Sequence, residues 1–331
     1  MKYFVGVDIG ATWIRIAVAT EHGKIIDRIK GRTPQRGNPS ILSSVIINLI
    51  RKMLIRNNIR RVESIGIGSI GPLDLTKGVI TNPPNISMEN IPISKPLYEE
   101  FNVPVYLVND CTAGVLGEKI FGAGKNIDNL FYLTLSSGIG GGAIVDGKLL
   151  FGKDGNAPEI GHIVVDLKGK LKCGCGGYGH WEAYAGGKNI PKYAKLLIKE
   201  KFGICMFKKS KLYNMVKGDT DKITTEMIFS AAKENDELAK LIVDELGRIN
   251  TIGVATIINV FDPELITIGG AIALNNPELI LKPILENIRK YVINRIPKIE
   301  ITPLGDDIVL YGALAIAMNP HYIPSKFRRF E

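Results

Sequence analysis

The sequence has few of the features that mark secreted, membrane-spanning or disulfide-rich proteins. It contains four cysteines in 331 residues, and so few thiols suit a reducing compartment rather than a disulfide framework. The N-terminal stretch MKYFVGVDIG lacks the long apolar core and small-residue cleavage site of a secretory signal. No apolar run is long enough to span a bilayer. These absences predict a cytoplasmic protein that makes no contact with a membrane.

Acidic residues are also in short supply. Lys and Arg number 42 against 33 Asp and Glu, which gives a net charge of +9. The basic residues are scattered apart from small clusters at 206–211 and 326–330, whereas a nucleic-acid interface gathers them on one face. We therefore expect no nucleic-acid partner, and a soluble surface with some attraction for anions. The abundance of Ile and Lys favours a thermophilic source.

The chain is long enough for two domains, and two similar segments divide it. Residues 3–26 and 130–150 each read as strand, turn, strand, turn, strand. In both segments the first turn contains glycine, and the second reads Gly-Lys followed by an apolar residue. This repetition predicts duplicated halves, one at the start of each domain.

Helix and strand patterns follow the first of these segments. Residues 38–53 begin with Asn-Pro and carry apolar side chains at helical spacing, which predicts a helix. Residues 62–71 and 103–110 read as buried strands. Both strands end in polar residues or glycine, at the edge where open α/β sheets usually bind their ligands.

The second half is richer in helical patterns. Residues 188–250 are predicted to be mostly helical, with 224–247 as the strongest amphipathic helix. A further helix at 249–261 leads to a strand at 264–273. We expect the last helix, near 311–318, to pack back on the first domain.

Two glycine-containing turns are candidates for binding phosphate. In DIGAT, Gly10 allows close approach of a ligand, Thr12 offers a hydroxyl and Asp8 could hold a hydrated Mg²⁺. In SSGIGGG, residues 136–142, the glycines expose backbone N–H groups of the kind that bind a polyphosphate. Each turn alone is equally a plain hairpin. Two such turns facing each other across a cleft make the stronger hypothesis.

Acidic and imidazole side chains supply candidates for the remaining chemistry. Asp110 follows a buried strand, where it could take the proton of an attacking hydroxyl or simply cap the next helix. Glu159, His162 and Glu182 suit vicinal sugar hydroxyls, although each acid alone is also an ordinary surface acid, and His162 lies in what reads as an apolar strand. The glycines that follow strand 264–268 fit either a flat nucleoside surface or a helix start.

The segment KCGCGGYGHWE brings two of the four cysteines together. Cys173, Cys175 and His180, with the upstream His162, form a set of two sulfur and two nitrogen ligands that suits a structural Zn²⁺. The spacing of the two cysteines is tighter than the usual C-x2-C. The alternative is two buried thiols in a glycine-rich turn.

Taken together, these motifs resemble the ROK family, whose members are sugar kinases and repressors of the actin, Hsp70 and hexokinase superfamily. The resemblance runs over nearly the whole chain, in family order: VDIGATWIRIAV, GPLD, NPPNI, NDCTAGVLGEKIFGAG, SSGIGGGAIVDGKL, EIGHIVV, CGCGGYGHWEAYAGG and ITIGGAI. It implies an α/β fold of two actin-like, ribonuclease H-like domains with mixed five-stranded sheets around a central cleft. The expected domains are 1–112 plus about 306–331, and 113–305 with the zinc-binding segment.

The resemblance also implies a role for each candidate residue. Asp110 would be the catalytic base. The sugar would contact Asn85, Asn109, Asp110, Glu159, His162 and Glu182. The phosphates of ATP and their Mg²⁺ would contact Asp8, Gly10, Thr12, Ser137, Gly138 and Gly140, with Gly269 and Gly270 near the nucleoside. A structural Zn²⁺ would be bound by His162, Cys173, Cys175 and His180.

Two departures from the family pattern concern these sites. His180 stands where the family usually has its third zinc cysteine, and imidazole can replace thiolate on zinc. Ser136-Ser137 replaces the usual Gly-Thr before GIGGG, which keeps a hydroxyl in the turn.

The resulting hypothesis is an ATP-dependent hexose kinase that transfers the γ-phosphate to the 6-hydroxyl of glucose or of a range of hexoses. The alternatives are a kinase of N-acetylmannosamine, N-acetylglucosamine, fructose or allose, and a sugar-sensing protein without catalysis. A repressor is not expected, because the first strand starts at Tyr3 and leaves no room for a preceding DNA-binding helix-turn-helix. The family usually dimerises, so a homodimer or higher homo-oligomer is expected.

Overall fold

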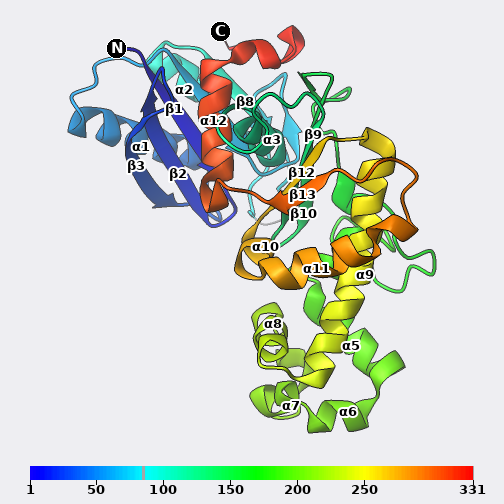
Figure 1. The fold of residues 1–331 in the computed structure, drawn as a ribbon. Helices are drawn as coiled ribbons and strands as arrows, with labels where there is room; N and C mark the ends of the chain where they lie inside the picture. The colour runs from blue at the N-terminus through cyan, green and yellow to red at the C-terminus, as the bar shows by residue number, and fades with distance from the viewer. Residues whose placement is uncertain (84–85, 331) are drawn as a thin grey trace. The chain divides into compact units, whose positions relative to one another are not determined.

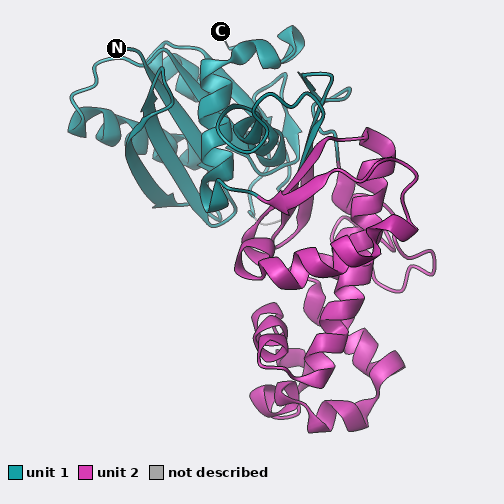
Figure 2. Cartoon of the chain, viewed as in Figure 1, with its two compact units in different colours: residues 1–132, 142–158, 302–331 teal, residues 133–141, 159–301 magenta. Residues whose placement is uncertain are grey.

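The computed structural model describes residues 1–83 and 86–330, and the chain forms two compact units (Figure 2). Unit 1 contains Met1–Tyr132, Gly142–Pro158 and Thr302–Glu331, and unit 2 contains Leu133–Gly141 and Glu159–Ile301. The domains expected from the sequence differ from these units mainly at residues 113–132 and 142–158. Residues 113–120 belong to the helix Asp110–Ile120, which packs against the last helix of the chain in unit 1.

The sheet of unit 1 has the strand order β3-β2-β1-β4-β8 (Figure 1). The first three strands form an antiparallel meander, and the next two lie parallel to the first. Most residues of its central strands are apolar and fully buried, as expected for strands covered on both faces. Their bounds are β1 Tyr3–Ile9, β2 Trp13–Thr20, β3 Ile25–Arg32, β4 Ser64–Ser69 and β8 Val105–Asn109.

Helices cover both faces of this sheet. On one face, α12 (Ile308–Met318) lies directly on β1 and β4. It approaches so closely because Gly66 has no side chain: a Cβ there would lie 2.0 Å from the carbonyl oxygen of Ala313. α3 (Asp110–Ile120) packs against α12, and α1 (Ser40–Arg56) packs against β2 and β3. The expected packing of the last helix on the first domain is thus observed within unit 1.

Unit 1 also contains elements that the sequence analysis did not predict. A small sheet is formed by β5 (Leu73–Asp74), β6 (Val79–Ile80) and β7 (Ile91–Pro92). The following helix, α2, spans Ser94–Phe101. These strands have two residues each and carry no alternating pattern, so only the chain's tertiary course reveals them.

A second five-stranded sheet repeats the design of the first. Its order is β11-β10-β9-β12-β13, so an antiparallel meander again precedes two strands on its far side. The bounds are β9 Leu130–Leu135, β10 Ile139–Val145, β11 Lys148–Leu149, β12 Leu265–Gly269 and β13 Lys298–Ile301. The predicted mixed sheets are confirmed, and the two meanders have the same strand arrangement. The second meander does not open unit 2 by itself, because residues 130–132 and 142–149 belong to unit 1.

Unit 2 is mainly helical, as predicted, but one boundary was wrong. The predicted helix at 224–247 is broken, and the predicted helix at 249–261 is not separate. The observed helices are α8 (Thr225–Lys233) and α9 (Glu237–Phe261). The break occurs because Asn235 has a left-handed backbone, with φ 64°, and because the Asp236 side chain accepts a hydrogen bond from Ala239 N at 2.8 Å and caps α9.

The remaining helices of unit 2 are short. They are α4 Trp181–Ala185, α5 Ile190–Leu197, α6 Ile204–Lys209, α7 Lys211–Val216, α10 Ala271–Asn275 and α11 Pro277–Asn287. Among the helices of residues 1–83 and 86–330, none is long and apolar enough to cross a membrane.

Candidate active site

The DIGAT turn joins β1 to β2 and is held by its own backbone and by the end of β3. Gly10 N donates to Trp13 O at 3.0 Å, which closes the hairpin. Thr33, just after β3, donates from its N to Thr12 O at 3.1 Å and from its Oγ1 to Gly10 O at 2.8 Å. Thr12 itself is exposed. The turn is therefore braced from behind, with the Thr12 hydroxyl on the solvent side.

Asp8 lies at the end of β1, where burial and an ion pair act in opposite directions. Arg15 on β2 contacts only Oδ2, with its Nε at 2.7 Å and Nη2 at 2.6 Å. Burial nevertheless raises the pKa of Asp8 to about 6; Arg15 lowers it, and the charge of Asp110 raises it further. Oδ1 thus belongs to a buried carboxylate that an added cation would stabilise, which fits a role in holding Mg²⁺.

Asp110 lies two strands away from Asp8, at the same carboxyl edge of the sheet. The register aligns Ile9, Ser69 and Asn109 in one row, so Asp8 precedes this row on β1 and Asp110 follows it at the start of α3. Asp110 begins α3, and its Oδ1 accepts from Cys111 N at 2.8 Å. Burial raises the pKa of the Asp110 carboxyl, and the hydrogen bond from Cys111 opposes the shift. A raised pKa improves a carboxylate as a proton acceptor near neutrality.

Asn109 caps the same helix. Its Oδ1 accepts from Cys111 N at 2.9 Å, which is the N-cap arrangement. The Asn109 side chain also hydrogen bonds to Asp110 and lowers the pKa of that carboxyl, and its amide nitrogen has a second hydrogen that can be donated to a ligand hydroxyl. Helix capping and ligand binding are thus compatible at this position.

The SSGIGGG turn of unit 2 is held by the carboxylate of α4. Glu182 Oε2 accepts from Ile139 N at 2.8 Å, and a Cβ on Gly138 would lie 2.4 Å from that oxygen. On the other side, Gly187 N donates to Ser136 O at 2.8 Å. Ser137 is exposed. The turn is therefore ordered rather than a loose hairpin, and a side chain at position 138 would displace the Glu182 carboxylate from Ile139 N.

The glycines after β12 have a packing role of their own. Gly270 has φ +85°, and a Cβ there would lie 2.5 Å from the carbonyl oxygen of Leu135 on β9. Close strand packing is thus sufficient to explain glycine here. A nucleoside contact at Gly269 or Gly270 stays a prediction.

The four predicted metal ligands come together in unit 2. Their ligand atoms, from His162, Cys173, Cys175 and His180, all lie within 4.8 Å of one another. Cys175 Sγ is 3.2 Å from His180 Nδ1, and Cys173 Sγ is 3.8 Å from His162 Nδ1. A tetrahedral zinc site has edges of about 3.3–3.8 Å between such ligands. The donor set and its dimensions therefore fit Zn²⁺.

Backbone hydrogen bonds also hold the ligand loop. Cys173 N donates to Gly177 O at 2.7 Å, and Trp181 N donates to Ile163 O at 2.9 Å. Burial raises the pKa of the Cys173 thiol to about 11, so without a cation this thiol stays protonated at neutral pH. A bound cation would supply the charge that ionises it.

His162 is not in a strand, as the sequence analysis expected, but in the 3-10 turn Ile160–His162 that follows Pro158. This turn directs the two ring nitrogens to different partners. Nδ1 faces Cys173, and Nε2 lies 3.7 Å from Glu159 Oε2. The two roles predicted for His162, metal ligand and sugar contact, therefore use different atoms of one ring.

Not every predicted residue can be placed with the others. Asn85 lies outside the described residues. Asp8, Gly10, Thr12, Asn109 and Asp110 gather in unit 1, while the SSGIGGG turn, Glu159, Glu182, Gly269, Gly270 and the metal ligands belong to unit 2. The sequence analysis missed Arg15, the ion-pair partner of Asp8. Its signal was a charged residue inside an otherwise apolar strand, WIRIAVAT.

Comparison with known proteins agrees with this fold and arrangement. Residues 4–319 match the sequence model of the ROK family. A glucokinase of Pyrobaculum calidifontis is 38% identical over 327 residues, which cover 99% of each chain.

Solved structures agree as well. A ROK family glucokinase from Streptomyces griseus, in complex with glucose and AMPPNP, is 32% identical with a TM-score of 0.74 and covers 95% of this chain and 99% of its own. The ROK hexokinase from Thermus thermophilus is 30% identical with a TM-score of 0.81, covering 96% and 99%. Two sheets of the same strand arrangement, with Asp8 and Asp110 at the carboxyl edge of the first, are the features of an actin-like sugar kinase fold. The chain belongs to the ROK family.

Proposed function

We propose that this protein is an ATP-dependent hexose kinase. Relatives named glucokinase match nearly its full length, and a ROK glucokinase structure with glucose and AMPPNP shares its fold. The observation that carries the proposal is a pair of acids at one edge of the sheet of unit 1, Asp8 on β1 and Asp110 at the start of α3, next to a braced hairpin turn. Asp8 can hold the Mg²⁺ that accompanies the phosphates of ATP, and Asp110 can accept the proton of the sugar hydroxyl.

Asp110 is the base in this mechanism. As the sugar hydroxyl attacks the γ-phosphorus in line, Asp110 accepts its proton. The hydrogen bond from Cys111 N fixes the orientation of the carboxylate. Burial raises its pKa, which makes it a better acceptor than an exposed aspartate.

Asp8, Gly10 and Thr12 serve the phosphates of ATP. Gly10 lets phosphate oxygens approach the turn, and the Thr12 hydroxyl donates to them. When bound, Mg²⁺ neutralises charge on the phosphates, with Asp8 as its anchor. In unit 2, Ser137, Gly138 and Gly140 belong to the second phosphate-binding turn.

The sugar contacts are Asn85, Asn109, Glu159, His162 and Glu182. His162 presents Nε2 while its Nδ1 faces the cysteines. Glu182 already holds Ile139 N through Oε2, and its Oε1, which accepts from Cys173 Sγ at 3.8 Å, has a further lone pair for a hydroxyl. We propose the 6-hydroxyl of glucose, or of a range of hexoses, as the acceptor.

A structural Zn²⁺ bound by His162, Cys173, Cys175 and His180 fixes this part of the sugar site. Its role is to hold His162 and α4, which follows His180 directly and carries Glu182. The metal thereby orders residues that touch substrate and takes no part in phosphoryl transfer.

We further propose a cytoplasmic homodimer or higher homo-oligomer from a thermophilic source. The small number of cysteines and the dimerisation typical of the family support this assignment. Light scattering on purified protein measures the oligomeric state directly.

The test of the main proposal is Mg²⁺-dependent ADP formation from ATP against a sugar panel. The panel contains glucose, mannose, fructose, allose, glucosamine, N-acetylglucosamine and N-acetylmannosamine. We expect turnover on glucose and on at least one other plain hexose. A strong preference for an acetylated sugar would assign the enzyme to amino sugars. Sugar binding without any turnover would make it a sugar-sensing protein.

A further inference from the structure

An exposed tryptophan lies between two cations beside the DIGAT turn. Trp13 follows Thr12 directly and is 37% exposed. Lys30 Nζ lies 4.0 Å and Arg32 Cζ 3.9 Å from the centre of its ring. Residues two apart on a strand are about 7 Å apart, so a ring held between Lys30 and Arg32 accounts for both distances. We call Trp13, Lys30 and Arg32 the tryptophan clamp.

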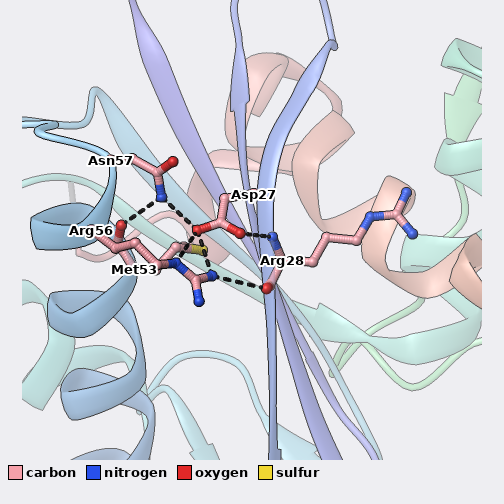
Figure 3. A network of polar contacts seen from close by, with 5 residues as sticks. All are labelled: Asp27, Arg28, Met53, Arg56 and Asn57. Carbon is pink, nitrogen blue, oxygen red and sulfur yellow. Dashed lines mark hydrogen bonds and ion pairs between the residues drawn. The ribbon is translucent and has the colours of Figure 1, made fainter.

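Lys30 and Arg32 lie on one face of β3 together with a third basic residue, Arg28. The three differ in whether they have an acidic partner. Side chains alternate between the faces of β3, and Figure 3 shows Asp27 directed to α1 while Arg28 points away from it. Arg28, Lys30 and Arg32 therefore share the second face. Arg28 pairs there with Asp307, whereas Lys30 and Arg32 have no acidic partner within residues 1–83 and 86–330.

The register places Lys30 and Arg32 next to the DIGAT turn. Arg32 is the cross-strand partner of Trp13, and Lys30 is the partner of Arg15, which holds Asp8. Thr33 follows Arg32 and hydrogen bonds to the backbone of Gly10 and Thr12. A ligand at the clamp would thus share its supporting backbone with the turn.

We infer that the tryptophan clamp is an anion subsite that takes a phosphate group. Two like charges held on one indole ring repel each other, and a doubly charged anion that bridges them removes this repulsion. Arg offers a planar fork that matches phosphate oxygens, and Lys adds a point charge. The phosphate belongs either to the donor nucleotide or to the phosphorylated product, and this assignment to a reaction component rests on the proposed function.

The fluorescence of Trp13 can report ligand binding at the clamp. The chain has only two tryptophans, and the second, Trp181, is fully buried. We expect inorganic phosphate, titrated at constant ionic strength without ATP or sugar, to change the fluorescence of Trp13 in a saturable manner. The Lys30→Gln/Arg32→Gln variant should lose this response, and Trp13→Phe should remove the signal. The matched control, Arg60→Gln/Arg61→Gln, changes the net charge equally at exposed positions of the same unit and should keep the response.

Kinetics then distinguish the two sources of phosphate. If the clamp holds the donor, Lys30→Gln/Arg32→Gln raises the KM for ATP about three- to tenfold with kcat retained. If it holds the product, the KM for ATP is unchanged and inhibition by the sugar phosphate weakens by a similar factor. Either result supports the subsite.

The inference is overturned if phosphate gives no saturable change, or if the control loses the response to the same extent as the clamp variant. The phosphate titration requires no turnover. A protein without kinase activity can therefore still confirm the subsite, and an active kinase can still refute it. Single variants Lys30→Gln and Arg32→Gln, checked by circular dichroism, replace the double variant should it fail to fold.

Discussion

At the scale of single residues, Asp110 is the most direct test of the mechanism. We expect Asp110→Asn to lower kcat by about a hundredfold to ten-thousandfold, because the amide cannot accept the hydroxyl proton. Sugar binding, measured by calorimetry, should change little, because the amide keeps the size of the side chain. Asp244→Asn, at an exposed position of α9, is the control and should retain wild-type turnover. Near-normal turnover of Asp110→Asn would remove this residue from the mechanism.

Asp8 makes a prediction about pH. Folding raises its pKa from 3.8 to about 6 through burial, so the folded protein favours the protonated form. The stability that Asp8 contributes is therefore complete below about pH 4 and is lost as the pH rises through 6.

The variant Asp8→Asn has no proton to lose at this position. In metal-free buffer, its free energy of unfolding relative to wild type should increase by up to about 3 kcal/mol between pH 4 and pH 7. Urea unfolding at several pH values measures the difference, with Asp244→Asn as the exposed control. A difference that does not vary with pH would show that Asp8 is not perturbed by burial.

Some residues of the candidate site could be picked out from the sequence alone, and others could not. Asp8 and Asp110 were found because each ends an apolar strand, a position visible in one dimension. Arg15 was missed because its partner, Asp8, faces it only across the register of two strands. The two ring nitrogens of His162 face different partners because it lies in a 3-10 turn, and the apolar residues around it predicted a strand instead.

At the scale of elements, the metal loop gives the clearest prediction. We expect about one equivalent of zinc per chain. His180→Ala should lose the metal and raise the KM for the sugar, because His162 and α4 lose their anchor. His180→Cys should retain the metal, since thiolate is an equivalent ligand.

Cys205→Ala, at an exposed cysteine of α6 outside the cluster, is the control for this series and should behave as wild type. Metal analysis by mass spectrometry after gentle purification provides the measurement. Purified wild-type protein with no zinc, or His180→Ala with a full complement, would contradict the assignment.

Elements were predicted well where a run of apolar residues ended in glycine, as in both meanders. They were predicted poorly where one residue decides the outcome. The break between α8 and α9 depends on the left-handed Asn235, which is exposed, and on the capping Asp236, which is buried. The apolar spacing on either side continues across these two polar residues, so it does not reveal the break. The two-residue strands β5 to β7 have no periodicity to detect.

At the scale of the whole molecule, unit 1 is assembled from distant parts of the chain. Its sheet comes from the first 109 residues, but its covering helix α12 is Ile308–Met318. We expect a chain ending at Ile301 to leave unit 1 unfolded, with trypsin cleaving rapidly within residues 1–132. A chain ending at Asn319 keeps α12 and should resist trypsin. Equal resistance of both truncated chains would show that the sheet does not need this helix.

The close packing of α12 on glycines of β1 and β4 affects the order in which the parts of unit 1 can fold during synthesis. α12 packs against Gly6 on β1 and Gly66 on β4. These strands are synthesised about 240 residues or more before α12, so the sheet is complete well before the helix that covers it. Unit 2, which ends at Ile301, can complete its fold while translation continues. During this period one face of the nascent sheet lacks its covering helix and exposes apolar side chains. Such a surface is prone to aggregate and is the kind that chaperones bind.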